Sequence, residues 1–460
     1  MEKQHHERST FSGKLGFVLS AAGASVGLGN IWRFPYLAAK YGGGIFLLVY
    51  IILALTFGYT MIVAESALGR MTRKSPVGAF RSFAKGKKVG WLSFGGWINA
   101  IIPVLIVPYY SVIGGWVVKY LFEYIRGNGS KLAEDGYFSG FISNGGATEL
   151  CFVIFCMVTL VIIYAGVQNG IERVSKIMMP ILIVLSVIIA IYSVTRPGAI
   201  EGVKYFLVPN VKNFSWMTVV AAMGQMFYSL SIAMGILVTF GSYMRKDTSI
   251  EDSTRNVEIF DTAIAMMAGL MIIPAVFAFS GGDPDTLQAG PSLMFITIPK
   301  VFANMGFGTA VGILFFVLVL FAAVTSSIAL TESAVSTFED ELGWGRKKAT
   351  VLTGVIMIAL GTLSCLGYGP LDFVKIIGMQ FLDFFDFLTN SVMMPIAALM
   401  TSLLVSRVIG VDKIEEEIRH GESAFRRKKI FVIMIKYLCP IFALIILASS
   451  VANAFGWISM

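Results

Sequence analysis

Residues 21–36 read AAGASVGLGNIWRFPY, and this stretch lies inside a segment that is otherwise apolar and long enough for a membrane helix. It holds three glycines, Gly23, Gly27 and Gly29, followed closely by the polar residues Asn30 and Arg33. Glycine destabilises a helix interior, and each unpaired peptide group in lipid costs several kcal/mol. The stretch therefore predicts a helix that is broken at membrane depth, where ions or a substrate complete the freed peptide groups. An alternative is that the glycines only permit close helix packing.

The rest of the chain has the composition of a membrane protein. Of its 460 residues 56% are hydrophobic and only 14% are charged, and the mean hydropathy is +0.77. A membrane-spanning helix needs about 20 apolar residues. Eleven such segments are present, at residues 15–38, 43–68, 92–125, 149–167, 176–195, 216–243, 259–279, 307–338, 350–368, 376–406 and 430–456. The sequence thus predicts an all-α polytopic membrane protein.

The positive charges indicate how the chain is oriented. Lys and Arg concentrate in residues 69–90 and 411–429, which an eleven-span topology places on the same side as the N-terminus. Cytoplasmic loops are enriched in Lys and Arg. We therefore expect a multi-pass protein of the cell (inner) membrane with a cytoplasmic N-terminus and an external C-terminus. The net charge of +8 then reflects topology, and it does not indicate nucleic-acid binding.

Segment 216–243 is the second unusual span. It carries hydroxyl side chains and glycines at its centre and follows the first span by five segments. Interrupted helices at corresponding positions of two halves are typical of inverted-repeat transporters. We expect a single transporter domain with a first five-helix repeat in residues 1–200 and an inverted second repeat in 210–410. Residues 411–460 would add a cytoplasmic loop and an eleventh helix.

Three motifs carry a family resemblance. They are AGASVGLGNIWRFPYLAAKYGGGIF at residues 22–46, GQMFYSLSIAMG at 224–235 and FAAVTSSIALTESAVSTFEDEL at 321–342. In this order they resemble the neurotransmitter:sodium symporter family, and the eleven-span length resembles its bacterial amino-acid transporters. The resemblance implies sodium-driven import of an amino acid by alternating access, with the lipid bilayer as partner and no nucleic acid. It leaves the oligomeric state open.

The resemblance also implies two sodium sites. The first would combine the substrate carboxylate with Ser25, Asn30, Ser229 and Asp261. The second would combine Gly23, Val26, Ala322, Thr325 and Ser326. Oxygen ligands without thiol or imidazole suit an alkali cation, and a ligand shared with the substrate would couple the two binding events. The alternative for Ser229, Thr325 and Ser326 is that each hydroxyl forms a hydrogen bond within its own helix.

Asp261 departs from the pattern of the chloride-dependent relatives. They carry Asn at this position and Ser one turn later, where this chain has Ala265. A carboxylate would supply the negative charge that chloride supplies there, so we expect transport without chloride. An ionisable group inside a span is functional by default. The alternative is an acid at a helix end that faces the cytoplasm.

The substrate site implied by the resemblance lies at the two broken helices. It would comprise Ala24, Ser25, Gly27, Leu28, Gly29, Ile106, Tyr110, Tyr228, Ser229, Ser231, Met234, Ser326 and Leu330. Gly27 favours an α-amino acid, because the monoamine transporters of the family place Asp there. The lining is apolar and uncharged, which predicts a neutral, hydrophobic or aromatic substrate. Ala233 replaces a glycine of the family, so the size of the substrate stays open.

Two gates complete the expectation. The outer gate would pair Arg33 with Asp386 above Tyr110 and Tyr228, with Asp383 as a rival acid. The cytoplasmic gate would comprise Arg8, Asp340, Tyr243 and Glu332, the alternative being an unpaired, solvated Arg8. Glu65 is expected to accept free amides of the broken first helix.

Other function classes lack support in the sequence. No histidine falls in an apolar segment, so no nucleophile–histidine pair can form there, and the YD and GxGD contexts of aspartyl intramembrane proteases are missing. No filter motif or ring of charges indicates a channel. An amino-acid sensor that no longer transports is the alternative on the same scaffold, and substrate counterflow in vesicles separates the two.

Overall fold

The computed structural model describes residues 8–84, 90–281 and 290–457. This part of the chain is all-α: outside the helices, backbone pairing between extended residues is limited to isolated bridges. The predicted all-helical class is therefore confirmed.

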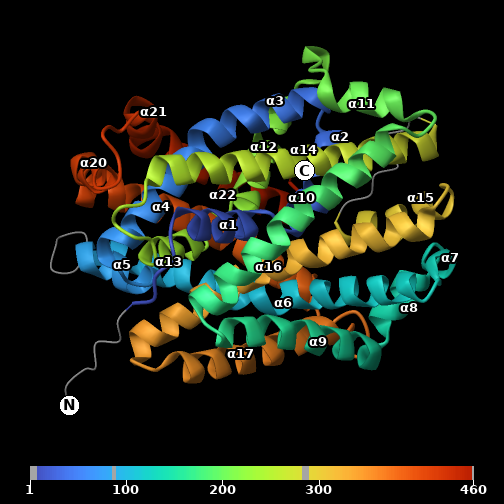
Figure 1. Cartoon of the computed structure of the whole chain (residues 1–460), viewed down its shortest axis with the longest axis horizontal. Helices are drawn as coiled ribbons and strands as arrows, with labels where there is room; N and C mark the ends of the chain where they lie inside the picture. Colours follow the sequence, from blue (N-terminus) through green and yellow to red (C-terminus); the bar gives the residue numbers. More distant parts are fainter. Residues whose placement is uncertain (1–7, 85–89, 282–289, 458–460) are drawn as a thin grey trace.

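Nine helical stretches in the described residues are long and apolar enough to cross a membrane, or ten if one bent pair counts as a single span. Four of them combine α-helical and π-helical pieces, and one begins with a 3-10 turn. The nine are α3 (Gly44–Leu53) with η2 (Ala54–Gly58) and α4 (Tyr59–Thr72); η3 (Gly90–Ser93) with α6 (Phe94–Ile125); α9 (Gly145–Tyr164); η4 (Val167–Glu172) with α10 (Arg173–Val194); α14 (Ile250–Ser280); α16 (Gly308–Leu342); α17 (Arg346–Leu366); α18 (Phe381–Asp386) with η8 (Phe387–Met393), α19 (Met394–Leu403) and η9 (Leu404–Ile409); and α21 (Lys428–Ile433) with η10 (Met434–Leu438) and α22 (Cys439–Ala454). Figure 1 shows the long helices running side by side along the longest axis of the molecule.

The bent pair is the segment that opens the sequence argument. Helix α1 (Lys14–Ser25) ends before Val26, and η1 (Gly29–Arg33) continues into α2 (Phe34–Lys40) as one helix, which is bent by 53° relative to α1. The predicted break is thus confirmed, and it falls on the stretch between Ser25 and Gly29.

The predicted span 216–243 is also divided. Helix α12 (Trp216–Ser229) and helix α13 (Ile236–Ser242) are separated by residues 230–235. Ser231 and Ala233 in this link have φ of 52° and 59°, a left-handed conformation that is uncommon for residues with a Cβ. Neither helix is long enough to cross a membrane alone, which is why this segment is absent from the nine or ten spans.

The remaining helices connect the spans. They are α5 (Pro76–Ala84), α7 (Gly129–Leu132), α8 (Tyr137–Ser143), α11 (Ala199–Leu207), η5 (Val211–Asn213), η7 (Leu293–Thr297), α15 (Ile298–Ala303) and α20 (Val411–Arg419). Some spans are longer than their apolar cores. The span predicted at 176–195 begins at Val167 in the structure. Its first residues include the polar Gln168 and Glu172, so the apolar stretch alone does not reveal this part of the helix.

The broken first helix lies at the centre of the packing. Helix α1 packs against α10, α14 and α16, while α13 packs against α4 and α16 against α6. All residues from Gly16 to Trp32 are buried, including both ends of the break. The freed peptide groups are therefore shielded from the surrounding lipid by protein.

Candidate functional site

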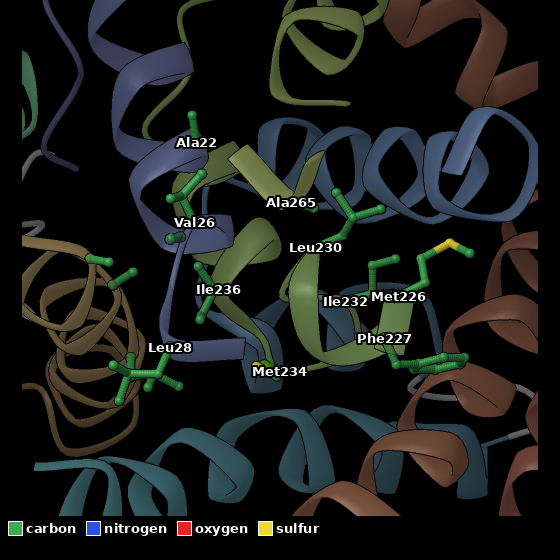
Figure 2. Close-up of a cluster of buried hydrophobic side chains, with 14 of the residues drawn as sticks. Ala22, Val26, Leu28, Met226, Phe227, Leu230, Ile232, Met234, Ile236 and Ala265 are labelled. Atoms are coloured by element: carbon green, nitrogen blue, oxygen red, sulfur yellow. The ribbon is translucent and has the colours of Figure 1, made fainter. Parts of the chain in front are cut away.

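The two helix breaks lie against each other. The Ser231 hydroxyl donates to the carbonyl oxygen of Ala24 at 2.9 Å, and the Gln225 amide donates to the carbonyl oxygen of Gly29 at 3.0 Å. Figure 2 shows the link after α1, with Val26 and Leu28, next to the divided segment that carries Leu230, Ile232 and Met234. Side chains of the second broken segment therefore replace the helical hydrogen-bond partners that the first one lacks.

A small cavity lies between the breaks. It is lined by Ala24, Ser25, Gly27, Leu28, Gly29, Asn30, Ile106, Tyr110, Tyr228, Ser231, Met234, Ser326 and Leu330. The structure thus brings together all the predicted substrate-site residues except Ser229, which points to Asp261, and it adds Asn30.

The polar groups of the cavity belong mainly to the broken first helix. The Leu28 amide is 3.3 Å from the Tyr110 hydroxyl, and the Gly27 amide donates to the Asn30 side-chain oxygen at 3.2 Å. A Cβ at Gly27 would stand 2.6 Å from the Ser326 hydroxyl, so a side chain here would fill the cavity. No Lys, Arg, Asp or Glu is among the lining residues. The site therefore offers peptide groups and hydroxyls in an apolar enclosure.

Asp261 lies beside this cavity in the interior of α14, and it is fully buried. Its Oδ1 accepts hydrogen bonds from the Asn30 amide and the Ser229 hydroxyl, both at 2.8 Å, and its Oδ2 accepts one from the Tyr50 hydroxyl at 2.7 Å. The alternative of an acid that faces the cytoplasm from a helix end is therefore wrong. All three donors are neutral, so they orient the carboxylate and leave its charge available to a cation.

The residues of the second predicted ion site also meet. The Ser326 hydroxyl is 3.3 Å from the Gly23 carbonyl oxygen and 3.4 Å from that of Val26. Gly23 packs against Thr325, whose hydroxyl donates within α16 to the Ala322 carbonyl oxygen at 3.2 Å. These carbonyl and hydroxyl oxygens form a donor set that suits an alkali cation.

The ion pair predicted for the outer gate is not formed in the structure. The Arg33 guanidinium lies 5.5 Å from the centre of the Tyr228 ring, and no ion pair joins it to Asp386 in the described part of the chain. Asp386 instead accepts hydrogen bonds from Tyr109 at 3.2 Å and from Asn390 at 2.6 Å. The rival acid Asp383 bonds to Tyr368 at 3.2 Å. Tyr110 and Tyr228, the two aromatic residues predicted for this gate, both line the cavity.

The residues predicted for the cytoplasmic gate are joined. Arg8 pairs with Asp340 at 2.6 Å, and its guanidinium lies 4.9 Å from the centre of the Tyr243 ring. The Tyr243 hydroxyl donates to Glu332 at 2.7 Å, and Arg346 pairs with Glu332 at 2.5 Å. The alternative of an unpaired Arg8 is therefore wrong.

Sequence reasoning does not identify several of the site residues. Tyr50, Tyr109 and Arg346 are single polar residues whose roles depend on partners in other helices or other parts of the sequence, and Gln225 lies in the motif at 224–235 without having been predicted as a site residue. The expectation for Glu65 needs correction. It accepts the amide of Ala233 at 2.8 Å, so it braces the break between α12 and α13 and not the break after α1.

Comparison with known proteins agrees with this geometry. The model of the sodium:neurotransmitter symporter family matches residues 8–130 and 137–456. The chain belongs to this family. This symporter is 36% identical over 417 residues to the sodium-dependent transporter YhdH of Bacillus subtilis, covering 90% of this chain and 91% of YhdH. It is 27% identical to the human sodium- and chloride-dependent GABA transporter 2, covering 91% of this chain and 76% of that one.

A solved structure extends the likeness to three dimensions. The crystal structure of MhsT in complex with L-phenylalanine has a TM-score of 0.86 and 36% identity, covering 96% of this chain and all of MhsT. The chain is accordingly a multi-pass membrane protein of a family of sodium-dependent transporters, and its family works by transport, not by enzymatic catalysis.

Proposed function

We propose that this symporter imports a neutral, hydrophobic or aromatic L-amino acid together with two sodium ions, independently of chloride. The observation that carries the proposal is the pair of facing helix breaks around one cavity, with a buried carboxylate beside it whose hydrogen-bond donors in the described chain are all neutral. Such a site needs cations and a zwitterion to complete its peptide groups and its charge.

The substrate assignment rests on the lining of the cavity. The amides of Leu28 and Gly29, the Tyr110 hydroxyl and a sodium ion would bind the substrate carboxylate. Carbonyls around Ser25 and Tyr228 and the Ser231 hydroxyl would face its ammonium group. The absence of charge from the lining favours a neutral side chain. That the structurally similar MhsT was solved with L-phenylalanine supports an aromatic or hydrophobic amino acid.

The ion assignment rests on two sets of oxygen donors. The first sodium ion would lie among Ser25, Asn30, Ser229, Asp261 and the substrate carboxylate. The second would lie among Gly23, Val26, Ala322, Thr325 and Ser326. In the first site Asp261 would supply the negative charge that chloride supplies in chloride-dependent relatives. The hydroxyls of Tyr50 and Ser229 already donate hydrogen bonds to this carboxylate, so they would not be available as donors to a chloride ion.

The membrane arrangement belongs to the same proposal. We count α12 and α13 together as the sixth of eleven spans, which makes residues 1–200 and 210–410 two inverted five-helix repeats with the eleventh helix outside them. The N-terminus would face the cytoplasm and the C-terminus the outside of the cell (inner) membrane. In alternating access, the joined Arg8 and Asp340 close the cytoplasmic side while Arg33 and Asp386 stand apart on the outer side.

The test is uptake by sealed proteoliposomes. An inward sodium gradient should drive the accumulation of radiolabelled phenylalanine, tryptophan or leucine, and replacing chloride by gluconate should leave the rate unchanged. Uptake that ignores sodium would refute the coupling. Counterflow of labelled substrate distinguishes a carrier from a sensor, because only a carrier exchanges internal for external amino acid.

A further inference from the structure

Two neighbouring membrane-spanning helices each carry a π-helical turn with one exposed basic residue. Arg407 lies in η9 at the end of one span, and Lys436 lies in η10 within the last span. These two turns pack against each other. Both side chains are exposed, and neither has a hydrogen-bond or ion-pair partner within the described chain. Single π turns inside α-helices are frequent at functional sites.

The surroundings of Lys436 face the lipid. Ile433, Tyr437 and Ile441 on the same helix are 54%, 61% and 49% exposed. Neither Asp nor Glu occurs in residues 387–409 or 428–454, and Asp383 and Asp386, the two acids of the span that ends in η9, lie more than 20 residues from Arg407 near the opposite end of that span. A charge that faces hydrocarbon without a partner is costly. The two cations are therefore stable only if their charges reach the anionic groups of the membrane surface or of a bound lipid.

The length of the last span places Lys436 at the right depth for a lipid phosphate. The helix Lys428–Ala454 has 27 residues, so it is about 40 Å long, whereas the hydrocarbon core is about 30 Å thick. Lys436 is about 12 Å along the helix from Lys428, so it lies within about 2 Å of the boundary between head groups and acyl chains when the excess length of about 10 Å extends on the Lys428 side. Arg407 is two residues from the end of its span on the same side. An exposed tyrosine beside a basic residue is typical of this interface.

We propose that Arg407 and Lys436 bind the phosphate of one anionic phospholipid in the leaflet on the α20 side, with its acyl chains against the exposed residues of η10 and α22. The guanidinium would contact two phosphate oxygens and the ammonium a third. The exposed Lys429, two turns before Lys436, adds positive charge toward the head group. The proposal needs only the membrane-embedded fold, and it does not depend on the substrate or ions of the transport cycle.

The experiment titrates the purified full chain in detergent with phosphatidylglycerol or with phosphatidylcholine of the same acyl chains, and follows binding by native mass spectrometry. Each basic group near an anionic surface contributes about 1 kcal/mol, which is about fivefold in affinity. The wild-type chain should therefore prefer phosphatidylglycerol, and Arg407→Gln with Lys436→Gln should weaken its binding about 30-fold. Added choline chloride at constant sodium should weaken binding to the wild type and hardly affect the double variant.

The matched control is Arg173→Gln with Lys348→Gln. These residues are also one arginine and one lysine, both exposed and without side-chain partners in the described chain, at the ends of other spans. The control should keep wild-type lipid affinity, and an unchanged melting temperature and elution volume in detergent should show that both double variants are folded. The proposal is overturned if the test pair binds phosphatidylglycerol as tightly as wild type, or if the control loses as much. The assignment to a lipid would also be overturned if free inorganic phosphate at the same concentration bound the wild-type chain as well as phosphatidylglycerol does.

Discussion

Replacing Asp261 by Asn removes the one charge at the centre of the proposed sodium site without changing the size of the side chain. The carboxylate lies 2.8 Å from Asn30 and Ser229 and 2.7 Å from Tyr50, all of them neutral donors. An asparagine oxygen can still accept from one or two of these groups. The packing of the site should therefore survive, and the main loss is electrostatic.

The magnitude follows from Coulomb's law in a partly buried site. A carboxylate and a sodium ion about 4 Å apart at an effective dielectric constant of about 20 attract each other by about 4 kcal/mol. Losing this attraction corresponds to about a thousandfold weaker sodium binding. If chloride can enter the vacated position next to Tyr50 and Ser229, it should restore part of the loss, and transport should become chloride-dependent.

The assay measures substrate binding against sodium concentration, once in chloride and once in gluconate. The wild type should give the same sodium dependence in both salts. Asp261→Asn should need far more sodium in gluconate and less in chloride. Glu149→Gln is the control. The Glu149 carboxylate, in α9, accepts a hydrogen bond from Thr362 in α17, and Glu149 does not line the cavity. The reasoning fails if Asp261→Asn keeps its sodium affinity within threefold in gluconate.

Three further substitutions test other parts of the molecule. Gly27→Ala places a methyl group 2.6 Å from a serine hydroxyl in the cavity and should weaken substrate binding at least tenfold in calorimetry, with a Tm close to wild type. Asp340→Asn breaks the partly buried ion pair of the cytoplasmic gate, which is worth about 1 kcal/mol. It should speed tryptic cleavage of the N-terminal segment and lower substrate affinity about fivefold; unchanged cleavage would contradict the gate. Arg70→Met removes the fully buried guanidinium 2.6 Å from Glu417, which keeps its ion pair with Lys246 at 2.7 Å, and should cost about 1–3 kcal/mol of stability because buried acceptors lose their donor. A double variant that also replaces Glu417 by Met should recover part of the lost Tm, and no recovery would argue against a pairing role.

The broken first helix could be predicted from the sequence because its signal is local. Three glycines between Gly23 and Gly29 weaken a helix wherever it lies, and the structure breaks it there. Most of the residues that line the cavity could be predicted because they fall within the three motifs at residues 22–46, 224–235 and 321–342, whereas Ile106 and Tyr110 lie outside these motifs and are predicted from the family resemblance alone. The one predicted residue that does not line the cavity, Ser229, sits at the last turn of α12, where a small rotation decides whether it faces the cavity or Asp261.

The other elements depend on packing that no local pattern reveals. Helix α13 has only seven residues, so its apolar run alone does not reveal how α12 and α13 divide the segment. Tyr50 and Tyr109 read as ordinary aromatic residues of apolar spans until the fold places them against Asp261 and Asp386. Arg33 and Asp386 could be predicted as two opposite charges that can pair. Whether they are in contact depends on the distance between their helices, which changes with the conformation of the transporter.

The contacts of Asp261 explain how sodium binding and gate closure can be one event. Asn30 donates to this carboxylate from the second half of the broken first helix, while its oxygen accepts the amide of Gly27 in the break itself. A cation that binds Asp261 therefore also acts on the link between the two halves of that helix. The first half carries Ser25 and leads back to Arg8 at the cytoplasmic gate. The buried charge thus lies where a change in its ion occupancy can be passed to the half-helix whose movement would open the cytoplasmic side.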